Sequence, residues 1–148
     1  SDPRAVDVLL KLANENGHAL QEVAAEAIGH LRRSAKAEEI GKTLERLAKS
    51  PMQGVMQRAL VGLRWFDSAS GWQIIRAKAK DPSWKTRQVA NEQLGHDTDP
   101  VTKELLLERL RTDTDNDATG AALDSALKLF GADSMEPYYA ALVNSRFA

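Results

Sequence analysis

A short apolar column recurs four times along the chain, at intervals of 35, 31 and 33 residues. Its three members are spaced i, i+4 and i+8 in each copy, which places them on one stripe of a helix. The four copies are Leu20-Ala24-Ile28, Val55-Ala59-Leu63, Thr86-Ala90-Leu94 and Thr119-Leu123-Leu127. A repeat of this length is typical of stacked helical pairs that bury their apolar faces against one another.

The turn residues between the apolar segments divide the chain into nine expected helices. Asp2 and Pro3 suit the start of the first helix, and Asn16-Gly17 suits its end. The second helix, at about 18–33, is expected to run through Leu20, Val23, Ala24, Ala27, Ile28 and Leu31. The pattern as a whole predicts one all-α domain over residues 1–148, with helical pairs at about 2–33, 36–66, 68–95 and 98–130 and a closing helix at 133–146.

One segment has a more specific pattern, Asp81-Pro82-Ser83-Trp84-Lys85-Thr86-Arg87-Gln88-Val89-Ala90-Asn91-Glu92-Gln93-Leu94-Gly95. It resembles the second half of a HEAT repeat, which has an Asp-Pro turn, an apolar residue before Arg, two small residues and Leu-Gly. Thr86 stands where that family usually has Val. The resemblance implies a right-handed α-solenoid, with the first helix of each pair on the convex side and the second on the concave side. It also implies a module of a larger protein. Because Ser1 is not an initiator methionine, we expect the chain to be a fragment.

Composition excludes several classes of function. The formal net charge of −1 gives no overall attraction to nucleic acid or membrane, and the absence of cysteine excludes disulfides and thiolate metal sites. No apolar run approaches the roughly 20 residues of a transmembrane helix. We therefore expect a cytoplasmic protein that does not enter a membrane.

The titratable residues form no convincing catalytic or metal-binding motif, so we expect no enzyme activity, metal or cofactor. His30 and His96 each follow an apolar-Gly pair, and neither is part of the His-Glu dipeptide of the HEAT-repeat di-iron enzymes. Asp113, Asp115 and Asp117 alternate as in a calcium loop. An EF-hand would continue with Gly and then Glu, whereas this chain has Ala118 and Asp124, so helix capping is the simpler interpretation.

Charge and tryptophan are distributed unevenly, and this is the strongest indication of function. Residues 56–87 contain seven bases, two acids and all three tryptophans, whereas residues 92–117 contain eight acids and three bases. Basic and indole side chains at a surface favour binding of acidic groups or phosphates. The candidate binding residues are Arg58, Arg64, Trp65, Trp84 and Arg87.

Three interpretations of this middle region remain open. The favoured one is a non-catalytic scaffold that binds a protein or peptide on a concave helical surface. The alternative is a nucleic-acid-binding module. In its most remote form it would resemble the HEAT-like DNA glycosylases, and Asp67 beside Trp65 would take the place of the acidic residue of their binding surface. In the third, a structural spacer, the tryptophans fill gaps between helices and Arg87 bonds a turn acid such as Asp81.

Overall fold

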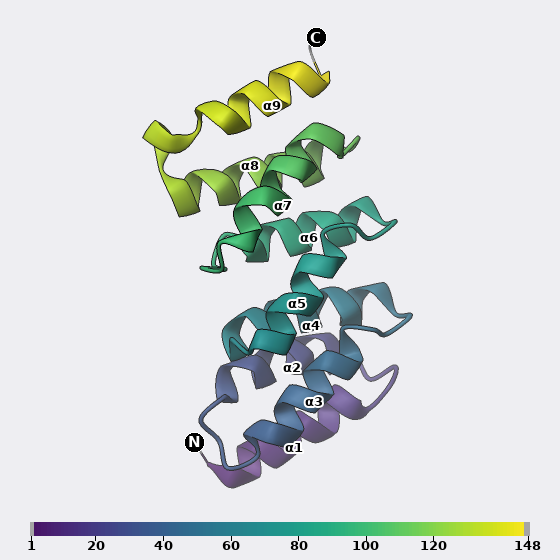
Figure 1. Ribbon diagram of the computed structural model, residues 1–148. Coiled ribbons are helices and arrows are strands. Elements are labelled where there is room, and N and C mark those ends of the chain that lie inside the picture. Colours follow the sequence, from purple (N-terminus) through teal and green to yellow (C-terminus); the bar gives the residue numbers. More distant parts are fainter. Residues whose placement is uncertain (1, 147–148) are drawn as a thin grey trace. The chain divides into compact units, whose positions relative to one another are not determined.

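The computed structural model describes residues 2–146, and the side chains of residues 2–144. This part of the chain is all-helical and contains no β-strand (Figure 1). The α-helices are α1 Pro3–Asn14, α2 Gln21–Ala27, α3 Ala37–Leu47, α4 Gln53–Phe66, α5 Ala69–Lys78, α6 Trp84–Leu94, α7 Val101–Thr112, α8 Asn116–Phe130 and α9 Glu136–Arg146. Two 3-10 helices, η1 Ile28–Leu31 and η2 Ala132–Ser134, follow α2 and α8. No helix between residues 2 and 146 is both long enough and apolar enough to cross a bilayer.

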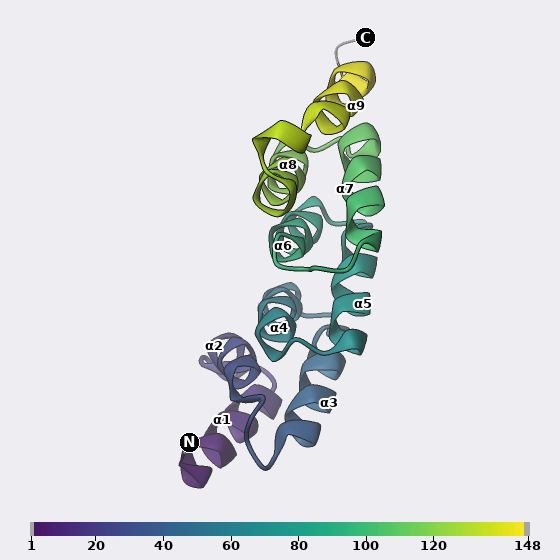
Figure 2. The same cartoon turned by 60° about the vertical axis from the view of Figure 1, so that its left-hand side comes forward.

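Contacts group the chain into two compact units, Ser1–Ile75 and Arg76–Ala148, and the division falls within α5. In the first unit, α1 packs against α2, α2 against α4, and α3 against α4 (Figure 2). The start of α1 follows from its sequence, since Asp2 accepts a hydrogen bond from the Arg4 N–H and Pro3 occupies the first turn. The largest fully buried side chains of this unit are Ile28, Ile40, Leu44, Leu47, Leu60, Leu63 and Ile75.

Two glycines allow η1 and α4 to come into backbone contact. A Cβ added to Gly29 would overlap the main chain of Gly62, and one added to Gly62 would lie 2.7 Å from the carbonyl oxygen of Ala25. Glycine is needed at such crossings because any side chain would push the two segments apart. The crossing therefore fixes which side chains of η1 and α4 lie beside each other.

In the second unit, α6 packs against α8, α7 against α8, and α9 against α7 (Figure 2). Small and amide side chains line the α6–α8 contact, which is therefore close and partly polar. Asn91 is fully buried and donates to the carbonyl oxygen of Ala118, and the Ser125 hydroxyl donates to the carbonyl oxygen of Asn91. These bonds satisfy groups that would be costly to bury alone.

The recurring column is buried at the central position of its first three copies, whereas Leu123, the central residue of the fourth, is only partly buried. Ala24, Ala59 and Ala90 are buried, as the column predicts. The predictions that Leu20 and Leu127 share this buried stripe are wrong, since both side chains are exposed. Leu20 precedes α2, where buried Gln21 bonds instead to the Ala13 carbonyl, and α9 packs chiefly against α7 and leaves Leu127 uncovered.

The second helix also differs from its prediction. The pattern predicts one helix at about 18–33, but the α-helix spans only Gln21–Ala27 and continues as the 3-10 helix η1. Val23, expected among its apolar residues, is exposed. The change of helix type falls where Gly29, a weak helix former, meets Gly62.

Candidate interaction surface

The five candidate residues are divided between the two units. Arg58, Arg64 and Trp65 lie on α4 in the first unit, whereas Trp84 and Arg87 lie on α6 in the second. We therefore treat the two groups separately. The group on α4 is joined by Glu26 of α2 and His30 of η1, neither of which was among the five candidates.

Trp65 is the centre of the group on α4, and its side chain is 43% exposed. The ring of His30, from η1, lies 4.5 Å from the Trp65 ring, centroid to centroid, with an angle of 34° between the planes. The Arg64 guanidinium lies 4.3 Å from the centroid of the Trp65 ring, within the range of a cation–π interaction. We call His30, Arg64 and Trp65 the indole cluster.

The Arg64 guanidinium has no carboxylate partner within ion-pair distance among the described side chains. Burial lowers the pKa of this group from its usual value, although an arginine keeps its charge at neutral pH. The contact with the Trp65 ring uses none of the guanidinium N–H groups in a hydrogen bond. Arg64 therefore offers a charged, planar donor beside an exposed apolar ring.

Arg58 lies on the same helix, but it is already paired. Its guanidinium bonds to the Glu26 carboxylate of α2, and both side chains are partly exposed. Such a pair contributes little to stability, on the order of 1 kcal/mol or less. It does, however, link α4 to α2, the helix that leads into η1.

Asp67, the acid considered for glycosylase-like chemistry, is engaged by two neighbours. The Trp72 indole N–H donates to its Oδ1 at 2.7 Å, and Arg32 bonds to its Oδ2 at 3.3 Å. Asp67 itself ends α4 in a left-handed conformation with φ of 60°. Trp72 is only 7% exposed, as its interpretation as a gap-filling side chain predicts. These contacts give Asp67 a structural role at the end of α4.

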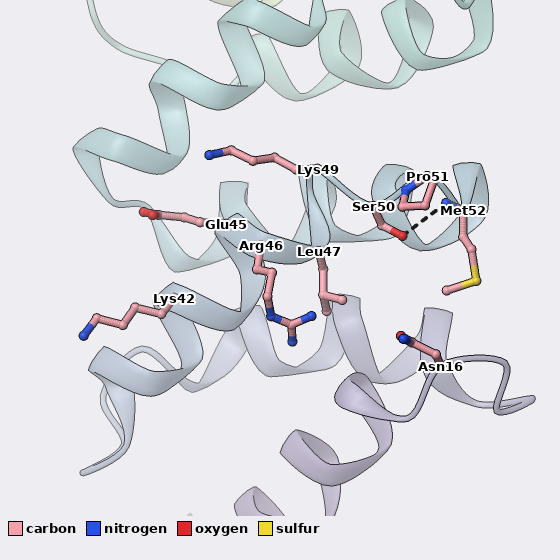
Figure 3. A pocket seen from close by; sticks show the side chains of 9 residues that line it. All are labelled: Asn16, Lys42, Glu45, Arg46, Leu47, Lys49, Ser50, Pro51 and Met52. Carbon is pink, nitrogen blue, oxygen red and sulfur yellow. Dashed lines mark hydrogen bonds between the residues drawn. The ribbon is translucent and has the colours of Figure 1, made fainter.

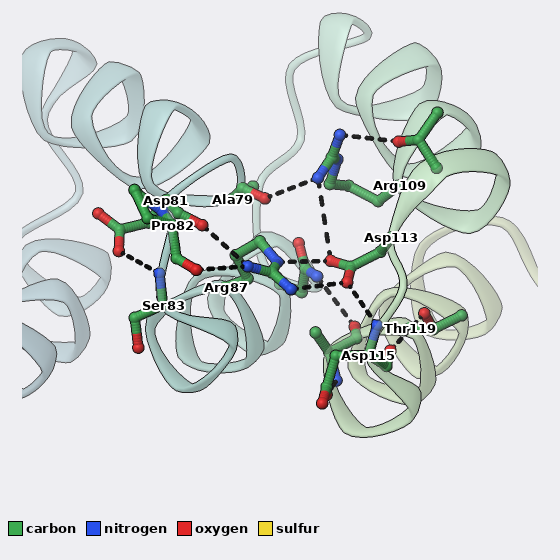
Figure 4. Close-up of polar contacts among 12 residues, drawn as sticks. Ala79, Asp81, Pro82, Ser83, Arg87, Arg109, Asp113, Asp115 and Thr119 are labelled. Carbon is green, nitrogen blue, oxygen red and sulfur yellow. Dashed lines mark hydrogen bonds and ion pairs between the residues drawn. The ribbon is translucent and has the colours of Figure 1, made fainter.

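Arg87 is held inside the second unit (Figure 4). Its Nε and Nη2 bond to the two carboxylate oxygens of Asp113 at 2.9 and 3.0 Å. Its Nη1 donates to the carbonyl oxygens of Asp81 and Pro82, both at 3.0 Å. The acid that pairs with Arg87 is therefore Asp113, 26 residues away, rather than the Asp81 carboxylate. Every nitrogen of this guanidinium is bonded, which leaves little of Arg87 for a partner.

Trp84 begins α6 and is 42% exposed. No ring or cation contact with Trp84 is found among the described side chains. It is thus an exposed indole without the flanking groups of Trp65. No group of three or more His, Asp or Glu side chains in residues 2–144 could hold a metal ion.

Two contacts around the indole cluster were not predicted from the sequence, those of His30 with Trp65 and of Glu26 with Arg58. His30 is exposed, and the Gly29–Gly62 crossing brings its ring to Trp65. Glu26, the partner of Arg58, stands 32 residues away. Neither contact can be read from local spacing, because both depend on how α2 and α4 pack.

No family model matches this sequence, and a search of curated proteins finds no significant similarity.

Proposed function

We propose that the chain is a non-catalytic binding module that contacts a protein partner through the indole cluster and Arg58. One observation carries the proposal: exposed Trp65 is flanked by His30 and by Arg64, whose charge no described carboxylate neutralises. Tryptophan and arginine are the side chains that most often dominate protein interfaces. A partner would cover the indole and place a carboxylate or carbonyl at the edge of Arg64.

The remaining bases favour a protein over a nucleic acid as the partner. Of the seven bases in residues 56–87, five form ion pairs within the chain: Arg58, Arg76, Lys78, Lys80 and Arg87. Binding of nucleic acid draws its affinity from cations that neutralise phosphates. Only Arg64 and Lys85 lack such a pair among the described residues, which is a small number for a phosphate-tracking surface.

We further propose that the chain is a HEAT-like solenoid. The packing of second helices within each unit supports this, α2 on α4 in the first and α6 on α8 in the second. The resemblance of residues 81–95 to a HEAT repeat supports it independently. A rigid stack of this kind would hold the indole cluster in place without any chemistry of its own.

Site-specific cross-linking tests the proposed surface. A photoreactive phenylalanine analogue replaces Trp65 in one variant and Trp84, which is equally exposed, in the matched control. We expect a discrete cross-linked protein from position 65 in an extract of the source cells, and its loss when Arg64→Glu is added. Equal cross-linking from both positions would contradict the assignment to the indole cluster.

Fluorescence anisotropy with a labelled DNA duplex tests the alternative. We expect no binding at low salt, because most bases are paired within the chain. Binding that weakens steeply with added salt would instead favour a nucleic-acid function.

A further inference from the structure

A second surface of the first unit, separate from the indole cluster, has the character of a binding site. An open groove of about 700 Å³ runs beside α3 and is bordered by the turns that join α1 to α2 and α3 to α4 (Figure 3). None of the three residues of the indole cluster lines it. We call it the α3 groove.

One wall of the α3 groove carries three cations. Lys42 and Arg46 lie one turn apart on the same side of α3, and Lys49 lies in the turn that follows the helix. Arg46 bonds to the Asn14 side chain, which holds it at the edge of the groove. Lys42 has only a highly exposed pair with Glu38 at 3.1 Å, and Lys49 forms no ion pair with a described side chain. Both lysines are therefore open to an incoming anion.

The negative charge in the groove does not cancel these cations. Glu45 is the only acid among the lining residues, all of which are described, and its carboxylate accepts a hydrogen bond from the Ser70 hydroxyl. Three cations against one engaged acid leave the groove positive. A ligand with several carboxylates would complement it, and a neutral or basic one would not.

The opposite side of the groove is apolar. Pro51 and Met52 lie in the turn before α4, and the Met52 side chain is 36% exposed. Methionine adapts its shape to different apolar partners. A ligand that fits both walls would therefore carry acidic side chains on one side and an apolar side chain on the other.

We propose that the α3 groove binds an acidic peptide segment of a protein partner. Carboxylates of the peptide pair with Lys42, Arg46 and Lys49, and an apolar side chain lies against Pro51 and Met52. The charge complementarity of the groove carries this assignment. It is independent of the proposed role of the indole cluster, because the two surfaces share no residue.

Fluorescence anisotropy with a labelled peptide of alternating glutamate and leucine tests the proposal, and the same peptide with glutamine in place of glutamate is the control ligand. We expect saturable binding of the acidic peptide alone. The double variant Lys42→Gln with Lys49→Gln should lower the affinity for the acidic peptide roughly five- to tenfold, because it removes two exposed ion pairs. The matched control, Lys85→Gln with Lys128→Gln, removes the same charge from exposed positions in the second unit and should leave binding unchanged.

Amide chemical shifts locate the bound peptide. We expect shift changes from Lys42 to Met52 and none at His30 or Trp65. A Met52→Ala variant should fold normally and bind the peptide more weakly. Failure of the acidic peptide to bind, equal losses in both lysine pairs, or shift changes confined to the indole cluster would each overturn the proposal. Tighter binding of a DNA duplex in the same groove would overturn it as well, since the groove would then be a phosphate site.

Discussion

Two single residues, Gly29 and Gly62, decide how the proposed interaction surface is assembled. Their backbones meet where η1 crosses α4, and the indole cluster follows directly, since His30 is the next residue after Gly29 and Trp65 lies three after Gly62. A methyl group at Gly29 would overlap the main chain of Gly62, and one at Gly62 would lie 2.7 Å from both the Ala25 carbonyl oxygen and a methyl of buried Leu44. Packing at this point therefore affects both stability and the cluster.

We expect Gly62→Ala to lower the free energy of unfolding by about 1–3 kcal/mol, the usual cost of overpacking a core. Gly120 provides the control, because it lies in α8 with nothing within 4 Å of an added Cβ. Gly120→Ala should raise the free energy of unfolding by roughly 0.5–1 kcal/mol, because alanine has the higher helix propensity. Urea denaturation followed by far-UV circular dichroism measures both. A stabilised Gly62→Ala variant would contradict the close crossing.

Asp113 is the second residue on which local stability depends. Burial raises the pKa of its carboxyl, but the hydrogen bonds from Arg87 and the Asp115 N–H, together with the charges of Arg87 and Arg109, outweigh burial and lower the pKa below its usual value. A carboxyl with a lowered pKa in the folded state stabilises the fold above its ordinary pKa. That contribution is lost as the pH falls through the folded value.

We expect Asp113→Asn to cost about 2 kcal/mol at neutral pH, because Arg87 keeps its bonds to two carbonyls but loses its buried carboxylate. The difference in stability from the native protein should begin to narrow below the ordinary aspartate pKa of about 4 and should be lost as the pH falls through the lowered pKa of folded Asp113. Urea denaturation from pH 7 to pH 3 measures this. Asp133→Asn, at an exposed position, is the control and should shift stability little at any pH. A gap that stays constant with pH would argue against the lowered pKa.

At the scale of elements, the start of α8 shows what three alternating acids do. Asp113 pairs with Arg87, while Asp115 accepts a hydrogen bond from the Ala118 N–H at 2.9 Å and caps the helix. Asp117 lies in the first turn, where its charge complements the helix dipole. The capping interpretation of this segment is thus confirmed for Asp115.

We expect Asp115→Ala to lower the free energy of unfolding by about 1 kcal/mol, the usual cost of losing an N-cap. Asp117→Ala, which removes an acid from the same turn without removing a cap bond, should cost no more than about 0.5 kcal/mol. Thermal unfolding measures both. The melting temperature should also be the same with calcium and with a chelator, and a rise with calcium would revive the calcium-loop hypothesis.

Local chemistry predicted the elements better than it predicted their contacts. Asp2-Pro3 and Asp115 mark helix starts because caps act over three residues, a distance that sequence shows directly. The predicted end of the second helix was wrong, because the Gly29–Gly62 crossing is a tertiary contact that overrides helical periodicity. The predicted partner of Arg87 was wrong for the same reason. The partner of Arg87 stands 26 residues away, and its distance in space is set by packing alone.

The cations of the α3 groove were visible in the sequence, since Lys42, Arg46 and Lys49 have helical spacing. They lie outside the base-rich window at 56–87, and a count of charges gives no sign of which are already paired. Within that window most bases bond to acids of the chain itself. Most of the bases that produce the charge asymmetry therefore form ion pairs within the chain. Arg64 and Lys49, which form no such pair with a described side chain, are available at the two proposed binding surfaces.

At the scale of the whole molecule, most contacts are internal to one of the two units. We therefore expect damage in one unit to loosen that unit first. Hydrogen exchange, which reports local opening of helices, can compare two variants for this purpose. Gly62→Ala acts at α4 in the first unit. Arg87→Ala acts at α6 in the second, where it removes the two hydrogen bonds that Arg87 donates to the buried Asp113 carboxylate.

Gly62→Ala should speed amide exchange in α2, η1 and α4 while α6 and α8 keep their protection, and Arg87→Ala should do the reverse. The reason is that a lost contact raises the population of states in which its own helices open, and helices that share no contact with it are affected only through global unfolding. Exchange measured on peptic fragments resolves the two units. Equal loss of protection in both units for either variant would mean that the chain opens as a single cooperative body, and that the division within α5 has no energetic counterpart.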